Sequence, residues 1–373
     1  MENNKKIKVA ILGGGKNSAV GHAHISAILM SNRYEITSVC FSRDSDMNSN
    51  SVDFYNLNGI NLYDSLEELV NNESKKIDYV IILTPTDTHF EQLKFLLKLN
   101  INIICEKALV SSFKKAISLK DIIKESKSKL YVIYNYIGYP MVKEMKNIIQ
   151  TGKIGKINNI QIEMPQEGFI RMSNNNPITP QKWRLKDGEI ATISLDLGVH
   201  LHILIFYLTN LNPKSTVGIC NTFGNFPQVI DDINAIVKYE NGISCNMWFS
   251  KAATGYLNGL QIRIFGKNGS LTWVQTNPDI INYADIDGNK FVIDRNSPNL
   301  VISSIRDYNR FKPGHPSGFV EALSNYYIDI ANAHFEIEIE NEEVFGFEQS
   351  FLGLKLFQSI GKSAIEKKWI DLD

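Results

Sequence analysis

The chain has 373 residues, of which 43% are hydrophobic and 21% charged, and its formal net charge is -1. This length predicts two domains of ordinary size. The near-zero charge provides no broad basic surface for nucleic acid or an anionic membrane, so a small molecule is the expected partner.

The cysteines and the N-terminus bear on location. The cysteines lie far apart and form no C-x-x-C pair, which argues against a zinc ribbon or a redox motif, and we expect no metal site. Residues 1–6 are polar and lead directly into an apolar strand-like run, unlike a signal peptide. No segment has the roughly 18 apolar residues of a spanning helix. We therefore expect a cytoplasmic protein that does not enter a membrane.

The first part of the chain alternates short apolar runs with amphipathic segments of helix length. This pattern is typical of a parallel sheet covered by helices, hence an α/β fold. It predicts a Rossmann NAD(P)-binding domain over residues 1–134. The expected strands are 8–12, 36–41, 79–83, 101–105 and 130–134.

The pattern changes after Pro140, where strand-like alternation and glycine turns predominate. Turns at 240–242 and 267–269 favour hairpins, so an antiparallel sheet is expected in an α+β domain over residues 135–373. Loops are expected at 171–181 and 296–310, and either could border a site. The expected strands are 159–164, 233–239, 243–249, 261–265 and 270–274, and the expected helices are 141–150, 192–208, 318–333 and 345–365.

A glycine loop follows the first expected strand. Gly13 and Gly15 fit the first two positions of a G-x-G-x-x-G fingerprint, and an insertion of three residues containing Ser18 places the third glycine at Gly21. Such a loop lets the backbone approach a pyrophosphate at a helix N-terminus. The alternative is an ordinary strand-to-helix turn.

Ser42, Arg43 and Asp44 follow the second expected strand, where the adenosine ribose is bound in such folds. Serine and arginine suit a 2′-phosphate, whereas the aspartate suits the ribose hydroxyls. The choice between NAD and NADP stays open.

Two further segments follow expected parallel strands. Residues 84–89 include Thr84, Pro85, Thr86 and His89, and they are either a cofactor-binding turn or simply a helix cap. Glu106-Lys107 follows the fourth long strand. There a lysine can stabilise a developing alkoxide, although a solvated Glu-Lys pair is the plainer interpretation.

The most distinctive local feature is Asp196 and His200 within an apolar segment expected to be helical. A spacing of four residues places both side chains on one helix face. The carboxylate can orient the imidazole, which suits a histidine that takes a proton from an alcohol. A structural Asp-His pair is the alternative. His202 should face away from the pair, and we expect it to serve packing.

Together these motifs, in this order, resemble the Gfo/Idh/MocA oxidoreductases, a family that includes glucose-fructose oxidoreductase and inositol dehydrogenase. The resemblance rests on the glycine loop with Ser18, Gly21 and His24, on Thr84-Pro85, on Glu106-Lys107, on the segment 135–140, and on Asp196-x-Gly198-x-His200. Gly314-His315-Pro316 resembles one branch of the family. The resemblance covers nearly the whole chain.

The resemblance implies a Rossmann domain followed by an α+β domain with a large open, mainly antiparallel sheet that often forms a homodimer or homotetramer. It implies that Lys107, Asp196 and His200 are catalytic, although Ala108 replaces the proline of the family's Glu-Lys-Pro motif. Glu106 is expected near the cofactor. Further candidate substrate contacts, each of which could equally be packing, are Asn135, Tyr136, Tyr139, Trp183, Arg184 and His315.

The expected function is NAD(P)-dependent oxidation of a hydroxyl carbon, or reduction of a keto carbon, of a sugar, cyclitol or nucleotide sugar. Two alternatives use the same fold: an NAD-dependent glycoside hydrolase that releases no net NADH, and a non-catalytic nucleotide-binding regulator. Retention of Lys107, Asp196 and His200 speaks against the regulator.

Overall fold

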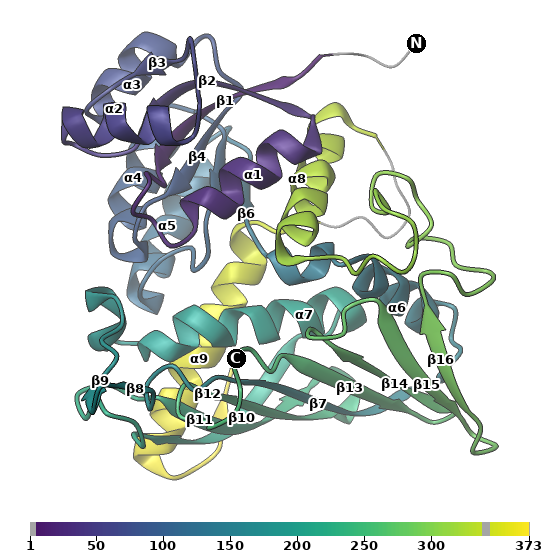
Figure 1. Ribbon diagram of the computed structural model, residues 1–373. Coiled ribbons are helices and arrows are strands. Elements are labelled where there is room, and N and C mark those ends of the chain that lie inside the picture. Colours follow the sequence, from purple (N-terminus) through teal and green to yellow (C-terminus); the bar gives the residue numbers. More distant parts are fainter. Residues whose placement is uncertain (1–4, 338–343, 373) are drawn as a thin grey trace. The chain divides into compact units, whose positions relative to one another are not determined.

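A computed structural model describes residues 5–337 and 344–372 of the chain. The first four residues of the polar N-terminal stretch lie outside this range. The chain forms two compact units: unit 1 comprises residues 1–138 and 319–350, and unit 2 comprises residues 139–318 and 351–373. Figure 1 shows the helices and strands along the chain.

Unit 1 is built on a six-stranded parallel sheet of order β3-β2-β1-β4-β5-β6. This is the strand order of a Rossmann fold, and it confirms the α/β expectation. The strands are nearly continuous apolar runs because both faces of the sheet are buried. They are β1 (Ile7–Gly13), β2 (Tyr34–Cys40), β3 (Asn61–Leu62), β4 (Tyr79–Leu83), β5 (Ile103–Cys105) and β6 (Leu130–Val132).

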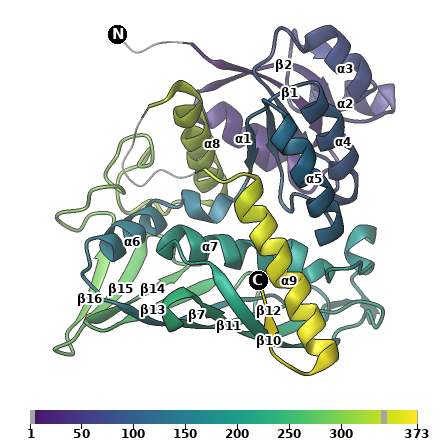
Figure 2. The same cartoon turned by 180° about the vertical axis from the view of Figure 1, so that it is seen from behind.

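Helices cover both faces of this sheet, with α1 and α8 on one side and α4 and α5 on the other (Figures 1 and 2). Side-chain caps begin three of them: Asp44, Ser65 and Ser112 accept hydrogen bonds from the first turns of α2, α3 and α5. The helices of unit 1 are α1 (Gly21–Ser31), α2 (Ser45–Phe54), α3 (Leu66–Glu73), α4 (Thr86–Lys98), α5 (Phe113–Glu125) and α8 (Phe319–Phe335).

Helix α8 joins unit 1 although it lies almost two hundred residues beyond β6. The Tyr34 hydroxyl of β2 donates to the Tyr327 carbonyl of α8 at 2.6 Å, and the two rings meet edge to face. The chain therefore leaves unit 1 after residue 138 and returns to it through α8. The chain then returns to unit 2 between residues 350 and 351, within α9 (Phe347–Glu366).

Unit 2 is built on a nine-stranded sheet of order β16-β15-β14-β13-β7-β12-β11-β10-β17. It is antiparallel except where β7 lies parallel to β12, which agrees with the expected mainly antiparallel sheet. Its strands are β7 (Ile157–Pro165), β10 (Pro213–Asn221), β11 (Asp232–Tyr239), β12 (Ser244–Ser250), β13 (Gln261–Gly266), β14 (Gly269–Val274), β15 (Ile280–Asp285), β16 (Lys290–Asp294) and β17 (Ile370–Asp371).

Alternating burial along these strands distinguishes the two faces of the large sheet. In β11, Ile233, Ala235 and Val237 are buried, whereas Ile236 is 43% exposed. Helices α6 (Pro140–Gln150) and α7 (Val199–Thr209) lie across the buried face (Figure 1). The opposite face carries a groove, so the sheet is open on that side.

The loop expected at 171–181 contains a two-stranded hairpin, β8 (Met172–Ser173) and β9 (Asn176–Pro177). The loop expected at 296–310 has no strand or helix, as predicted. It is held at one end by the buried Glu144 carboxylate, which accepts the backbone N–H groups of residues 301–303 at 2.9 to 3.4 Å. Glu144 therefore caps this loop much as an N-cap serves a helix.

Candidate active site

The glycine loop connects β1 to α1. Gly13 and Gly14 have φ angles of +77° and +78°, which favour glycine. A Cβ at Gly21 would lie 1.9 Å from the Gly14 carbonyl oxygen, so the helix start approaches the loop backbone too closely for any side chain. These constraints keep the glycine positions of the loop free of side chains, so that its backbone can approach a pyrophosphate. Gly14 is a loop glycine that the fingerprint spacing did not single out.

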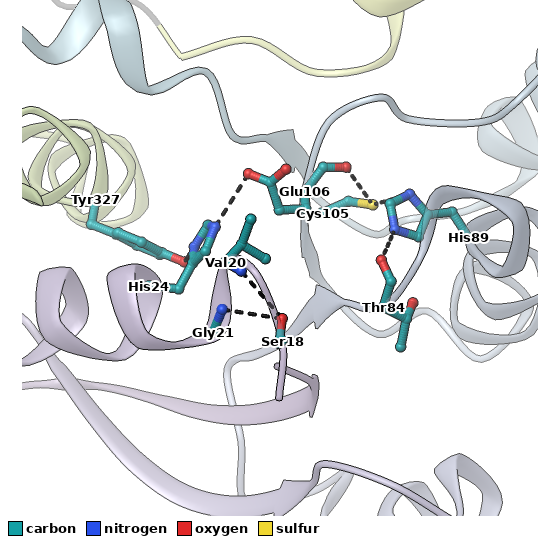
Figure 3. Close-up of polar contacts among 9 residues, drawn as sticks. All are labelled: Ser18, Val20, Gly21, His24, Thr84, His89, Cys105, Glu106 and Tyr327. Carbon is teal, nitrogen blue, oxygen red and sulfur yellow. Dashed lines mark hydrogen bonds and ion pairs between the residues drawn. The ribbon is translucent and has the colours of Figure 1, made fainter. Parts of the chain in front are cut away.

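Ser18 lies in the three-residue insertion. Its Oγ accepts from the backbone N–H groups of Val20 at 3.3 Å and Gly21 at 3.2 Å (Figure 3). The insertion thus supplies a side-chain acceptor to the start of α1, in place of a tighter glycine turn. Ser18 therefore shapes the loop, whatever else it contacts.

The segment after β2 is shaped by the start of α2. Asp44 Oδ1 accepts the Met47 N–H at 2.9 Å, and Ser42 Oγ accepts the Asp44 N–H at 3.1 Å. The buried Asn48 side chain bonds both backbone groups of Ser42, at 2.8 Å each. Arg43 is exposed at this position. The three residues expected to choose between NAD and NADP therefore lie together on a firmly held turn.

Thr84, Pro85 and Thr86 follow β4 and begin α4, as expected. His89, on the first turns of α4, is fully buried. Its Nε2 lies 2.8 Å from the Thr84 carbonyl (Figure 3). Its Nδ1 lies 3.0 Å from the Ala108 carbonyl. Burial lowers the pKa of His89, although the two carbonyls act in the opposite direction. The imidazole thus joins the loops that follow β4 and β5.

Glu106 and Lys107 follow β5 directly. The Glu106 carboxylate accepts from His24 Nε2 at 3.2 Å, and His24 Nδ1 lies 2.8 Å from the Tyr327 hydroxyl (Figure 3). All three side chains are buried. The chain of contacts ties β5 to α1 and α8, so the Glu106 carboxylate is committed to the protein's own network. Lys107 is half-buried, and its peptide bond to Ala108 is cis.

Asp196 and His200 lie in unit 2 on a helix whose geometry differs from the expected one. The helix begins at Thr192, as expected, but residues Ser194–Gly198 form a single π-helical turn within it, in which the Val199 N–H reaches back to the Ser194 carbonyl. Regular α-helix continues from Val199. Such turns occur often at functional sites. Asp196 and His200 are 6% and 7% exposed, one turn apart.

Two cations contact the Asp196 carboxylate. Lys251 Nζ, at the end of β12, lies 2.7 Å from Oδ2, and Arg184 Nε lies 3.1 Å from the same oxygen. Lys251 is itself 6% exposed, and its ammonium lies 5.5 Å from the centre of the Phe169 ring. Two adjacent positive charges favour the ionised form of a carboxylate, so Asp196 can act as a fixed negative charge one turn before His200.

Lys251 is a member of this cluster that the sequence did not reveal. It follows a strand expected from alternation, and it stands 55 residues beyond Asp196, so no local spacing connects the two. A lysine at the end of an apolar strand was the only signal. His202 is 1% exposed, and a Cβ at Gly353 would lie 2.8 Å from its ring, which fits the packing role expected for it.

The other expected substrate contacts fall into different environments. Asn135 is buried in a short 3₁₀ turn of unit 1. Tyr139 is fully buried in unit 2 against Trp273, and its hydroxyl accepts from Gln275, an arrangement typical of packing. Trp183 is 36% exposed, with the Arg184 guanidinium 4.7 Å from the centre of its ring.

His315 is exposed in the loop before α8 and is positioned by a buried arginine. Arg295 is 6% exposed, pairs with Asp279 at 2.9 Å, and donates to the His315 carbonyl and to the Asn309 side chain. Sequence reasoning missed Arg295 because it lies within a polar stretch without periodicity.

Comparison with known proteins identifies the family. Residues 7–134 match the oxidoreductase family model described as an NAD-binding Rossmann fold, and residues 142–272 match the GFO/IDH/MocA C-terminal domain. The chain belongs to the Gfo/Idh/MocA family of oxidoreductases. It is an enzyme of the NAD-binding class, as its glycine loop predicted.

Similar proteins include uncharacterized, inositol-acting and structurally determined members of the family. An uncharacterized oxidoreductase of Bacillus subtilis, YfiI, is 29% identical over 359 residues, covering 91% of this chain and 88% of that protein. The scyllo-inositol 2-dehydrogenase (NADP(+)) IolW of the same organism is 25% identical over 52% of this chain and 49% of its own length. An inositol dehydrogenase homolog from Azotobacter vinelandii, solved with NADH and myo-inositol, has the same fold with a TM-score of 0.86, 22% identity and 98% coverage of both chains.

The described residues contain neither a metal-binding cluster nor a membrane-spanning helix. Within residues 5–337 and 344–372, no group of three or more His, Cys, Asp and Glu side chains is arranged to hold a metal ion. No helix in that part of the chain has the length and apolar character needed to cross a membrane.

Proposed function

We propose that the protein is an NAD(P)-dependent dehydrogenase that acts on a hydroxyl or keto carbon of a sugar, a cyclitol or a nucleotide sugar. The observation that carries the proposal is the buried Asp196 carboxylate, which faces two cations and lies one turn before the buried His200. A carboxylate one turn before a histidine on the same helix can orient the imidazole for proton transfer. The inositol dehydrogenases among its relatives support this class of substrate.

The proposed mechanism assigns a role to each residue. His200 takes the proton of the substrate hydroxyl, and Asp196 orients its ring and stabilises the imidazolium that forms. Lys107, from unit 1, stabilises the alkoxide character that develops on the substrate oxygen. The nicotinamide, when bound, supplies the acceptor for the hydride. In the reverse direction His200 returns the proton to the carbonyl oxygen.

The cofactor would be held by the bare loop around Gly13, Gly15 and Gly21, with Thr84 to Thr86 as a second turn at the carboxyl edge of the sheet. The loop fits a dinucleotide because its glycines exclude side chains from the path of the pyrophosphate. Ser42, Arg43 and Asp44 would meet the adenosine ribose. NAD and NADP remain the two candidates, and comparative titration with NADH and NADPH separates them.

The candidate substrate contacts are polar and aromatic side chains. Trp183 and Arg184 form a partly exposed pair that contacts Asp196, and His315 sits on an anchored loop. Asn135 is a further candidate on unit 1. We leave Tyr139 out, because its ring is enclosed and its hydroxyl already accepts from Gln275.

We further propose that copies associate through the open face of the large sheet, as a homodimer or homotetramer. The groove on that face is lined by apolar and polar side chains, including Ile219, which is 62% exposed, and Ile236, which is 43% exposed. Burial of such residues favours association.

The four cysteines are free thiols, which suits the reducing cytoplasm that we propose as the location.

The experiment is a panel of inositols, sugars and nucleotide sugars incubated with protein and NAD or NADP, monitored through the absorbance of the reduced nicotinamide. His200→Asn should lose at least about a hundredfold in kcat on the active substrate, because the general base is removed. His334→Asn is the matched control, since His334 lies on α8 and bonds Tyr79. Product without net reduced cofactor would favour the glycoside hydrolase, and binding without turnover would favour a regulator.

A further inference from the structure

Two buried histidines of unit 1 contact the residues on either side of Lys107 in the chain. His24 on α1 is 2% exposed and His89 on α4 is 0% exposed. Each contacts a residue adjacent to Lys107 in the chain. His24 bonds the Glu106 side chain (Figure 3), and His89 Nδ1 lies 3.0 Å from the Ala108 carbonyl. Both rings use their second nitrogen on another part of unit 1.

The contacts of His24 fix its roles as donor and acceptor. An ionised carboxylate can only accept, so Nε2 donates to Glu106, and in the neutral ring Nδ1 then accepts from the Tyr327 hydroxyl. The ring also meets the Tyr327 ring edge to face, with centroids 5.9 Å apart. His24 therefore links the end of β5 to α8 through a buried imidazole.

The contacts of His89 offer two acceptors to a ring that carries one N–H when neutral. The Ala108 residue is 2% exposed, so its carbonyl needs a donor from the protein, whereas the half-buried Thr84 can also bond water. The Cys105 thiol, 3.5 Å from Nδ1, donates instead to the Glu106 carbonyl at 3.3 Å. These requirements place the N–H on Nδ1, facing Ala108.

We propose that His24 and His89 are positioning residues, which hold the backbone of Lys107 from both sides through the Glu106 carboxylate and the Ala108 carbonyl. The inference rests on the proposed role of Lys107. A lysine side chain is long and flexible, so the fold controls its ammonium mainly by fixing where its backbone lies. A displacement of about 1 Å at a reacting group can cost about a hundredfold in rate.

The test exploits the fact that each amide side chain reproduces one ring nitrogen of histidine. Asparagine places its Nδ2 where Nδ1 was, and glutamine places its Nε2 where Nε2 was. At position 24 the bond next to Lys107 uses Nε2, so His24→Gln keeps it and His24→Asn loses it. At position 89 that bond uses Nδ1, so His89→Asn keeps it and His89→Gln loses it.

The expected result is a crossed order of activities. His24→Asn and His89→Gln should lose about ten- to a hundredfold in kcat, whereas His24→Gln and His89→Asn should stay within about fivefold of the wild type. The dissociation constant of NADH, measured by fluorescence titration, should change less than about fivefold in His24→Asn and His89→Gln. His334→Gln, a histidine of the same unit outside these contacts, serves as the control for replacement by an amide.

If the histidines served only for packing, a different outcome is expected. The asparagine and glutamine variants at one position would then lose kcat equally, or the same amide would give the higher kcat at both positions. Either result would overturn the inference. The two positions are independent, so failure of one pair to fold leaves the other pair decisive. Lys107→Met separates this inference from the proposed function: if that variant keeps full kcat, the proposed role of Lys107 is wrong, whatever the histidine variants do.

Discussion

At the residue scale, the candidate site combines residues that the sequence identified with partners that it did not. Asp196 and His200 were found from their spacing, and Lys107 from its place after a buried strand. Their partners lie far away in the chain: Lys251 contacts Asp196, and His24 contacts Glu106. Such pairs depend on how strands and helices are arranged, which local patterns do not encode.

Lys251→Met tests the charge cluster around Asp196. Removal of the cation from a buried ion pair leaves the negative charge of the carboxylate without a partner. This costs about 3–5 kcal/mol where no second cation is present. Because Arg184 remains, we expect a loss of about 2–3 kcal/mol in the free energy of unfolding, measured by denaturant titration. Lys290→Met, on an exposed position of β16, is the control and should change it by less than about 0.5 kcal/mol. Equal effects of the two substitutions would contradict the buried pair.

His89 predicts a pH dependence of stability. Burial lowers its pKa below the usual 6.5, so below that pH the unfolded chain binds a proton that folded His89 resists. The stability that depends on neutral His89 is fully present above pH 6.5. It is lost as the pH falls through 6.5 toward the lowered pKa of the folded state. We expect the free energy of unfolding to fall more steeply between pH 7 and pH 5 in the wild type than in His89→Asn. Parallel curves for the two proteins would show that the His89 pKa is not lowered.

At the scale of elements, the strands of the Rossmann sheet were predictable because buried parallel strands are apolar runs bounded by loops. Two features were not. The π-turn at Ser194–Gly198 uses the same apolar residues as an α-helix, so periodicity could not reveal it. The membership of α8 in unit 1 depends on contacts of Tyr327 with residues of α1 and β2 that lie some three hundred positions away.

Two glycines in helical segments should respond oppositely to alanine. At Gly198, in the π-turn, a Cβ would lie 2.6 Å from a ring carbon of Phe357, which is closer than real Cβ atoms come. We expect Gly198→Ala to lower the free energy of unfolding by about 1–3 kcal/mol. At Gly361, inside α9, a Cβ would meet nothing within 4 Å, so Gly361→Ala should raise it by about 0.5–1 kcal/mol. Thermal or denaturant unfolding measures both changes. If both substitutions stabilise the protein, the π-turn has space for a Cβ at position 198.

At the scale of the whole molecule, alternation and glycine turns were sufficient to predict an α/β part followed by an α+β part. They could not show that the chain returns to unit 1 at residue 319, because the sequence of a helix does not determine which sheet the helix covers. The open face of the large sheet is likewise visible only once its strand order is known.

Ile236→Asp tests association through the open sheet face. A charge placed in the groove should shift the protein toward monomer, because an unpaired carboxylate is costly to bury in an interface. Light scattering coupled to size-exclusion chromatography measures the mass. Ile286→Asp, at a position that is 68% exposed outside the groove, should leave the mass unchanged. A wild-type protein that is monomeric at all concentrations would contradict the proposed interface.

The measurement that tests the proposed dehydrogenase most directly is transfer of deuterium from the substrate carbon to the nicotinamide. The active compound of the panel, deuterated at the carbon that bears the reacting hydroxyl, is incubated with protein and oxidised cofactor. We predict one deuterium in the reduced cofactor by mass spectrometry, accumulating together with the keto product. Consumption of the compound with no deuterated reduced cofactor would contradict the account.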